Sequence, residues 1–342
     1  MIHSNTADSP RTLEYVQERP QHLSEIEAYL TQLMSQFNTS NPNDTMSVGG
    51  TPDHVFEVLS GRKFSYLGRT KSAMYRQSIV DIAGHAMREQ QPIPFFYDIG
   101  GGYHAIPQRG AALSFDVGLA ELLILHQAVL FSNEIRSLYA PGLRFSLVVD
   151  NLCALVCNDI PLEKTTEYCR QLRVLIDDLG LASYIDVIVE SEHTSLTDFV
   201  RAMAERSASP CSAELTLQQY NNVERFLGRR CGGDEAAERA LHYKQIIEVS
   251  EHFLAPLITG IHLTQRATPS TICFRPFPGG DSRIQCGEVI LTRNSKGKLV
   301  PALMTNVKAY NCRRLQFPQV LPSMVPYVTA GECISPSNPS NL

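Results

Sequence analysis

A glycine-rich loop followed by a tyrosine and a histidine is the first part of the chain whose residue types could do chemistry. The segment Gly100-Gly101-Gly102-Tyr103-His104 follows a short apolar run, 94–99, that is rich in aromatic residues and predicts a buried strand. Glycines let a backbone approach a ligand closely, and a histidine titrates near neutral pH, so His104 could act as an acid or a base. The segment is not a dinucleotide fingerprint, because no helix opens directly after its glycines. It predicts either ligand contact by Gly101, Gly102, Tyr103 and His104 or a tight turn that binds no ligand.

Two carboxylates are candidates for proton transfer. Asp150 follows the β-rich run 143–149, so it would lie at the edge of a sheet, where it could orient a substrate amine or accept its proton. The alternative is that Asp150 bonds backbone amides in the turn that it starts, as Asx residues commonly do. Glu121 lies in the first turn of an apolar helix predicted over 117–139, where the helix dipole favours an anion even without a catalytic role.

Basic residues in the second half of the chain are candidates for binding a phosphorylated substrate. Guanidinium groups bind phosphate oxygens through two parallel hydrogen bonds, and a lysine adds a point charge or an amine that can form an imine. We expect Arg239, Lys244 and Arg275 to bind substrate, although most arginines of most proteins are simply solvated. Six further histidines show no metal-binding spacing, so we predict packing or surface roles for them. They are His85, His126, His193, His242, His252 and His262.

The elements that position these residues alternate between strand and helix. The hydrophobic periodicity and the helix-ending signals predict, in order, a strand at 94–99, a helix at 117–139, a strand at 143–149, a helix at 161–180 and a strand at 184–189. This order is typical of an α/β fold with a Rossmann-like, mostly parallel sheet flanked by helices. Such sheets bind ligands outside the carboxyl ends of their strands, which is where the glycine-rich loop and Asp150 would lie.

Changes in composition along the chain predict three parts. Residues 1–52 form an N-terminal tail, a helix and a linker, 53–320 form an α/β catalytic domain, and 321–342 form an irregular C-terminal tail. Within the catalytic domain we expect a βαβ core at 93–190, a helical region at 193–258 and C-terminal strands at 270–310, the last two of which are antiparallel.

Composition argues against several classes of protein. Of the 342 residues, 43% are hydrophobic and 19% are charged, which is the balance of a globular protein. The formal net charge of -5 provides no basic field for nucleic acid, and no apolar run is long enough to span a bilayer. We therefore predict a cytoplasmic protein with no nucleic-acid or membrane partner. The nine cysteines include no CxxC pair, so we expect reduced thiols, with Cys153 and Cys157 on a strand.

A set of short motifs extends over roughly residues 93–310. The motifs are Ile93-Pro94-Phe95, Glu121 in an apolar helix, Tyr139-Ala140-Pro141-Gly142, Val148-Val149-Asp150-Asn151, Tyr168-Cys169-Arg170-Gln171-Leu172, the run from Arg239 to Lys244 before a long helix, and Thr271-Ile272-Cys273-Phe274-Arg275-Pro276. This set resembles the isocyanide synthase family of pyoverdine and dityrosine biosynthesis proteins. The chain has the glycine-rich loop where that family usually has a Pro-x-Lys-Ser segment, Asn151 where it has a glycine, and Gly118 where an acidic residue is expected.

The resemblance implies an enzyme of specialised metabolism that joins the amine of an amino acid to the keto carbon of ribulose 5-phosphate and forms an isonitrile, with one carbon taken from the sugar. The residues that it implies for proton transfer are Asp150, Glu121, His104 and Tyr103, and those for the phosphate are Lys244, Arg275 and Arg239. The scheme requires no metal and no redox cofactor. Its partners would be an amino acid or amine, a sugar phosphate and an oxygenase downstream in the same pathway. Two alternatives stay open: a divergent transferase or lyase with another substrate, and a ligand-binding homologue without turnover.

Overall fold

The computed structural model describes the central α/β part of the chain and parts of its two ends. The described residues are 20–38, 49–65, 73–99, 117–158, 160–207, 233–264, 272–273, 289–293, 296–303, 312–315 and 328–331. Within them, no helix is long and apolar enough to cross a membrane.

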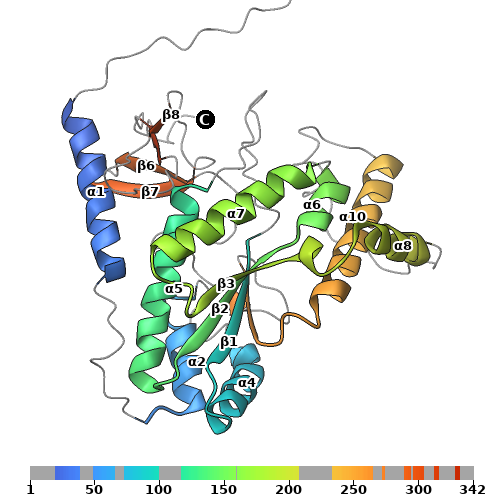
Figure 1. Cartoon of the computed structure of the whole chain (residues 1–342), viewed down its shortest axis with the longest axis horizontal. Coiled ribbons are helices and arrows are strands. Elements are labelled where there is room, and N and C mark those ends of the chain that lie inside the picture. Colours follow the sequence, from blue (N-terminus) through green and yellow to red (C-terminus); the bar gives the residue numbers. More distant parts are fainter. Residues whose placement is uncertain are drawn as a thin grey trace, which may run out of the picture.

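A parallel sheet forms the centre of the fold (Figure 1). Its strands are β1 (Ile93–Asp98), β2 (Leu143–Val149), β3 (Ile185–Val189), β4 (Ile261–Thr264) and β5 (Ile272–Cys273). They lie in the order β3-β2-β1-β4-β5, and every neighbouring pair is parallel. The predicted strands at 94–99, 143–149 and 184–189 are β1, β2 and β3, so the predicted Rossmann-like α/β fold is confirmed.

Helices lie on both sides of the sheet, with α5 on one side and α10 on the other (Figure 1). The helices of this region are α2 (Pro52–Ser60), α4 (Arg76–Arg88), α5 (Leu119–Leu138), α6 (Asn151–Asn158), α7 (Leu162–Asp178), α8 (Leu196–Ser207) and α10 (Gly233–Leu254). Two 3₁₀ turns accompany them, η1 (Ala73–Tyr75) and η2 (Glu190–Glu192). The predicted helices at 117–139 and 161–180 correspond to α5 and α7.

The two faces of the sheet differ in character because strand side chains alternate between them. One face, which we call the core face, carries Phe95, Tyr97, Phe145, Leu147 and Val149, each at most 1% exposed and part of the main apolar cluster with α5. The other, which we call the α10 face, has a smaller apolar cluster in which Phe96 and Val148 pack against Leu254 at the end of α10. Beyond that cluster the α10 face becomes polar towards the carboxyl ends of the strands.

Two glycines allow the chain to enter β2 and β4 in register. Gly142, just before β2, has a φ of +70°, and a Cβ there would lie 2.8 Å from Cγ of Arg136. Gly260, just before β4, approaches β1 so closely that a Cβ would lie 2.6 Å from the carbonyl oxygen of Pro94. A side chain at either position would displace its neighbour and shift the strand that follows.

A second sheet lies beside α5 and the N-terminal helix α1 (Pro20–Asn38) (Figure 1). Its strands are β6 (Val289–Arg293), β7 (Leu299–Leu303), β8 (Cys312–Leu315) and β9 (Val328–Gly331), in the order β7-β6-β9-β8. β6 and β7 form the predicted antiparallel pair. Ile26 and Leu30 of α1 join the same apolar cluster as Val289 and Leu291 of β6.

Two local predictions are wrong. The tail predicted to be irregular contains β9, which pairs with both β6 and β8. Cys153 and Cys157 lie on α6 rather than on a strand. Their segment is a short apolar run, and such a run is compatible with either element by periodicity alone. Here the amide groups of Leu152 and Cys153 donate to the carboxylate of Glu190, which caps the start of a helix.

Candidate functional site

The strand order of the main sheet reverses between β1 and β4. β2 and β3 follow one another outward on one side of β1, whereas β4 and β5 lie on its other side. Open α/β sheets bind ligands in the crevice outside the carboxyl ends of their strands at this reversal. The topology therefore selects one edge of the sheet as the candidate site before any side chain is considered.

Three acids come from the carboxyl ends of successive strands. Asp98 ends β1, Asp150 directly follows β2, and Glu190 directly follows β3. The register aligns Asp98 with Val148 and Val148 with Ile188. Because side chains alternate along a strand, this alignment directs all three acids to the α10 face. We call Asp98, Asp150 and Glu190 the acid cluster.

Asp98 also contacts a histidine across the strand reversal. Oδ2 of Asp98 lies 2.6 Å from Nε2 of His262 on β4. The ring of Phe96 stacks on His262 with centroids 4.4 Å apart and planes inclined by 25°. The side chains of His262 and Asp98 are 28% and 45% exposed, so the pair is accessible as well as oriented.

Asp150 is the most perturbed acid of the cluster. Burial first, and then the charges of Glu190 and Asp98, raise the pKa of Asp150 to about 8. Among the described residues, Oδ1 of Asp150 is buried without a hydrogen-bond partner. At neutral pH the carboxyl group is therefore mostly protonated, and it can donate a proton or a hydrogen bond to a ligand.

Glu190 combines a structural role with its place in the acid cluster. Its Oε2 accepts the amide hydrogens of Leu152 at 3.0 Å and Cys153 at 3.1 Å, which places a carboxyl group at the start of α6. Burial raises the pKa of Glu190, while hydrogen bonds from Ser250 of α10 and from these two amides oppose the shift. Glu190 thus links β3, α6 and α10 around the site.

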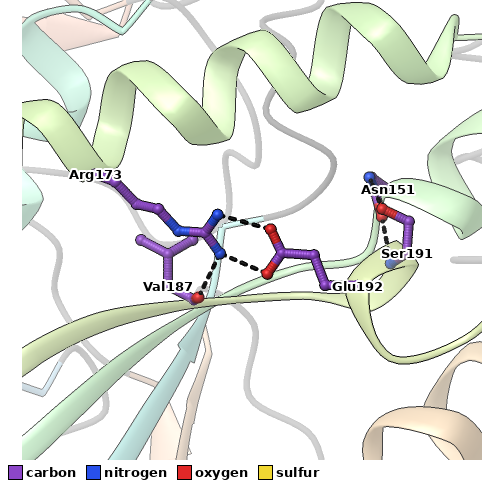
Figure 2. A network of polar contacts seen from close by, with 5 residues as sticks. All are labelled: Asn151, Arg173, Val187, Ser191 and Glu192. Carbon is purple, nitrogen blue, oxygen red and sulfur yellow. Dashed lines mark hydrogen bonds and ion pairs between the residues drawn. The ribbon is translucent and has the colours of Figure 1, made fainter.

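A network of polar contacts holds the turn η2, which carries Glu190 (Figure 2). The side-chain amide of Asn151 donates to Oγ of Ser191 at 2.8 Å, and its oxygen accepts the amide hydrogen of Ser191 at 3.0 Å. Arg173 of α7 donates two hydrogen bonds of 2.6 Å to Glu192 and a third, of 3.1 Å, to the carbonyl oxygen of Val187. These contacts hold the ends of β2 and β3 in a fixed relation.

Glu121 lies at the start of α5 and is only 4% exposed. Its Oε2 accepts the amide hydrogen of Gly118 at 2.7 Å, and its Oε1 accepts the hydroxyl hydrogen of Tyr168 at 3.0 Å. Gly118 therefore stands at the N-cap of α5, with Glu121 closing the first turn. Both oxygens of Glu121 are already engaged by the protein, unlike Oδ1 of Asp150.

The other predicted site residues are only partly described. Lys244 of α10 forms an ion pair of 3.8 Å with Glu248, and Glu248 also accepts a hydrogen bond from Arg206 of α8. Arg239 lies on α10, but its side chain is outside the described part of the chain, as are Gly101, Gly102, Tyr103, His104 and Arg275. The structure thus places Asp150 in the acid cluster. The binding of a phosphate by Arg239, Lys244 and Arg275 stays a prediction.

Three residues of the site are absent from the sequence-based prediction: Asp98, Glu190 and His262. Asp150 is selected as an acid at the end of a strand, and the same reasoning applies to Asp98, which ends β1 and is separated from the glycine-rich loop only by Ile99. The same argument reaches Glu190 once β3 is placed beside β2. His262 carries no such signal, because only the parallel pairing of β4 with β1 brings it to Asp98.

Comparisons with known proteins add a likeness in fold. No protein-family profile matches the chain, and no curated protein matches it in sequence. The structure is similar to the crystal structure of the PvcA protein from Pseudomonas aeruginosa, with a TM-score of 0.61 and 17% identity, over 82% of this chain and 99% of that chain. A tyrosyl-tRNA synthetase from Aeropyrum pernix gives a TM-score of 0.33 at 10% identity over 62% of this chain and 52% of that chain. The first likeness shows that this chain and PvcA share a fold.

Proposed function

We propose that this chain is an isocyanide synthase-like enzyme of specialised metabolism. Two independent features support the proposal. The fold is shared with PvcA over almost the whole length of that protein. The motifs that resemble the isocyanide synthase family include two acids, Glu121 and Asp150, which lie at the start of α5 and directly after β2. We also propose a cytoplasmic location and an oxygenase downstream in the same pathway.

The observation that carries the proposal is Asp150, whose Oδ1 is buried and whose pKa is raised among further acids. Asp98 and Glu190 make the surrounding field negative, which favours a ligand cation such as the ammonium group of an amino acid. Condensation of an amine with a ketone needs a proton removed from nitrogen and a proton delivered to oxygen. A carboxyl group whose pKa is raised to about 8 holds a proton that it can deliver at neutral pH.

The second substrate in this proposal is ribulose 5-phosphate or a similar phosphorylated keto sugar. We assign its phosphate to Lys244, Arg239 and Arg275, and its backbone contacts to Gly101 and Gly102. Tyr103, His104 and Glu121 complete the proposed set of residues for proton transfer. The product would be an isonitrile whose carbon comes from the sugar.

The test is turnover of the two substrates together. Purified protein is incubated with ribulose 5-phosphate and each of the protein amino acids, and consumption of the sugar is followed by mass spectrometry. We expect consumption that depends on one amine, and we expect Asp150→Asn to slow it by about 10²–10⁴-fold. Arg144→Gln is the matched control, because Arg144 is an exposed residue near the start of β2 and pairs with Asp186. A complete lack of amine-dependent consumption would contradict the proposal.

A ligand-binding homologue without turnover is the second candidate. The observation that favours it is the glycine-rich loop, 100–104, which stands where the family usually has a Pro-x-Lys-Ser segment. Binding of an amino acid, measured by calorimetry, in the absence of any sugar consumption would identify this case. Binding together with consumption identifies the enzyme.

A further inference from the structure

We propose that His262, oriented by Asp98 across the strand reversal, takes the proton from the substrate's ammonium group. This inference rests on the proposed function and assigns a catalytic residue within it. Neither residue is among those that the sequence motifs select. The pair is instead a product of topology, because β1 and β4 are far apart in sequence and adjacent in the sheet.

The position of the pair fits this task. The register aligns Phe96 with His262, so the histidine side chain lies on the α10 face. Asp98 lies on the same face of β1, two residues beyond Phe96 towards the carboxyl edge of the sheet. Asp98 reaches back to Nε2 of His262 at 2.6 Å. The pair therefore lies across the strand reversal, and α/β sheets of this order bind ligands outside the carboxyl ends of the strands at such a reversal.

The ring of His262 is held in one orientation. Phe96 stacks against one side of it, with centroids 4.4 Å apart, and Asp98 fixes Nε2. Among the described residues, no hydrogen bond to Nδ1 of His262 is present. A neutral imidazole that donates from Nε2 to a carboxylate carries its lone pair on Nδ1, so Nδ1 is the nitrogen that can accept a proton.

The charges around the pair favour a cationic substrate and the cation that proton transfer creates. The acids that interact electrostatically with the pair are Asp98 itself, from β1, and Glu251 of α10, whereas Asp150, which follows β2, is mostly protonated at neutral pH. Partial burial and then the charge of Asp98 raise the pKa of Glu251, and His262 opposes this shift, which places Glu251 in the same electrostatic environment. When an ammonium group binds here, contacts with these acids replace its bound water. The imidazolium that forms when His262 takes the proton remains paired with Asp98.

The proposed step is a single proton transfer. The ammonium N–H bond breaks, its electron pair stays on the substrate nitrogen as a lone pair, and the proton bonds to Nδ1 of His262. The free amine can then attack the ketone carbon of the sugar. Asp98 does not change its protonation state in this step; it orients the ring and stabilises the imidazolium, so it is a positioning residue.

The test compares variants of the pair with a matched histidine variant in the full chain. His262→Gln is expected to lower kcat by about 10²–10⁴-fold while KM for the amine changes little. Asp98→Asn should lower kcat by a smaller factor. His252→Gln, an exposed histidine of α10 one residue from Glu251, should behave like wild type. Circular dichroism and thermal melting show whether each variant is folded.

Chemical rescue separates a proton acceptor from a merely structural side chain. His262→Ala with added imidazole should regain activity in proportion to the imidazole concentration, and His262→Ala without it should not. The inference is overturned if wild type turns over substrate and folded His262→Gln does the same at an equal rate, or if imidazole has no effect on His262→Ala. Wild type that consumes no sugar with any amine overturns the proposed function itself, and the inference with it.

Discussion

An acid lies on each side of the main sheet, Glu121 at the start of α5 and Asp150 directly after β2, and the two have different hydrogen-bond partners. Glu121 on the core-face side has both oxygens hydrogen-bonded, to Gly118 and Tyr168. Asp150 on the α10 face has an oxygen without a partner among the described residues, and its pKa is raised to about 8. Buried polar groups in proteins are normally satisfied, yet Oδ1 of Asp150 and Oε1 of Glu190, in the same acid cluster, are both buried without a hydrogen-bond partner among the described residues.

The difference shows that the two acids contribute differently to the stability of this fold. The core face buries aromatic and aliphatic side chains completely, and its acid is part of the helix cap that holds α5 in place. The α10 face ends in Asp98, Asp150 and Glu190, and there burial, followed by the charges of Glu190 and Asp98, raises the pKa of Asp150. Glu190 also caps α6, whereas the raised pKa of Asp150 costs stability at neutral pH, and a perturbed acid of this kind is typical of a site for a ligand.

Removing a large side chain from the core face should have the largest effect on stability. Phe145 is 0% exposed, and Phe145→Ala is expected to lower the free energy of unfolding by about 3–5 kcal/mol through lost burial and a cavity. Ser146→Ala, the neighbouring residue on the α10 face, is the control and should change it by less than about 0.5 kcal/mol. Urea unfolding measures both. Equal losses would mean that the two faces do not differ as described.

Neutralising Asp150 should stabilise the protein, and increasingly so as the pH rises. Below about pH 4 the folded and unfolded states both carry the proton, whereas between pH 4 and 8 the unfolded state releases it and the folded state keeps it. Each pH unit in that window therefore costs the wild type up to about 1.4 kcal/mol, a cost that Asp150→Asn avoids. Unfolding of both proteins is followed at intervals from pH 4 to 8. A difference between them that stays constant over this range would contradict the raised pKa.

The corresponding substitution at Glu121, Glu121→Gln, should destabilise the protein, in contrast to Asp150→Asn. Glu121→Gln replaces an acceptor oxygen by a donor that faces the amide of Gly118 or the hydroxyl of Tyr168. We expect a loss of about 1–3 kcal/mol in the free energy of unfolding, since a buried donor is left unsatisfied. Tyr168→Phe combined with Glu121→Gln should cost less than the sum of the single changes. Stabilisation by Glu121→Gln would show that the two acids are equivalent.

The core face could be predicted from sequence, whereas the α10 face could be predicted only in part. Apolar runs such as 143–149 and the turn at Pro141-Gly142 locate β2 and the start of its register, because burial and turn chemistry are local properties. They also place Asp150 at a strand end. The pairing of β4 with β1 joins segments separated by 164 residues at Asp98 and His262, and no local pattern encodes it.

Glu190 and Cys153 show a second limit of the same kind. The segment after Asp150 is apolar and short, so its periodicity does not decide between strand and helix. The decision comes from Glu190, which accepts the amides of Leu152 and Cys153 from a different part of the chain. Sequence rules search for a capping residue next to the helix, so they do not detect a cap such as Glu190, which follows a different strand.

The smallest effect is expected outside both faces, at the solvent-exposed contacts that hold η2 (Figure 2). The side chains of Arg173 and Glu192 are 41% and 47% exposed, so their ion pair should contribute about 0.2–1 kcal/mol in a double-mutant cycle. Arg173→Ala should cost more than Glu192→Gln, because Arg173 also donates to the carbonyl oxygen of Val187. The coupling should fall as salt is raised from about 0.1 M to 1 M, where the screening length shortens to about 3 Å. The interpretation of this pair as a weak, solvent-screened contact would be wrong if its coupling energy exceeded the stability lost in Glu121→Gln, or if that coupling energy did not respond to salt.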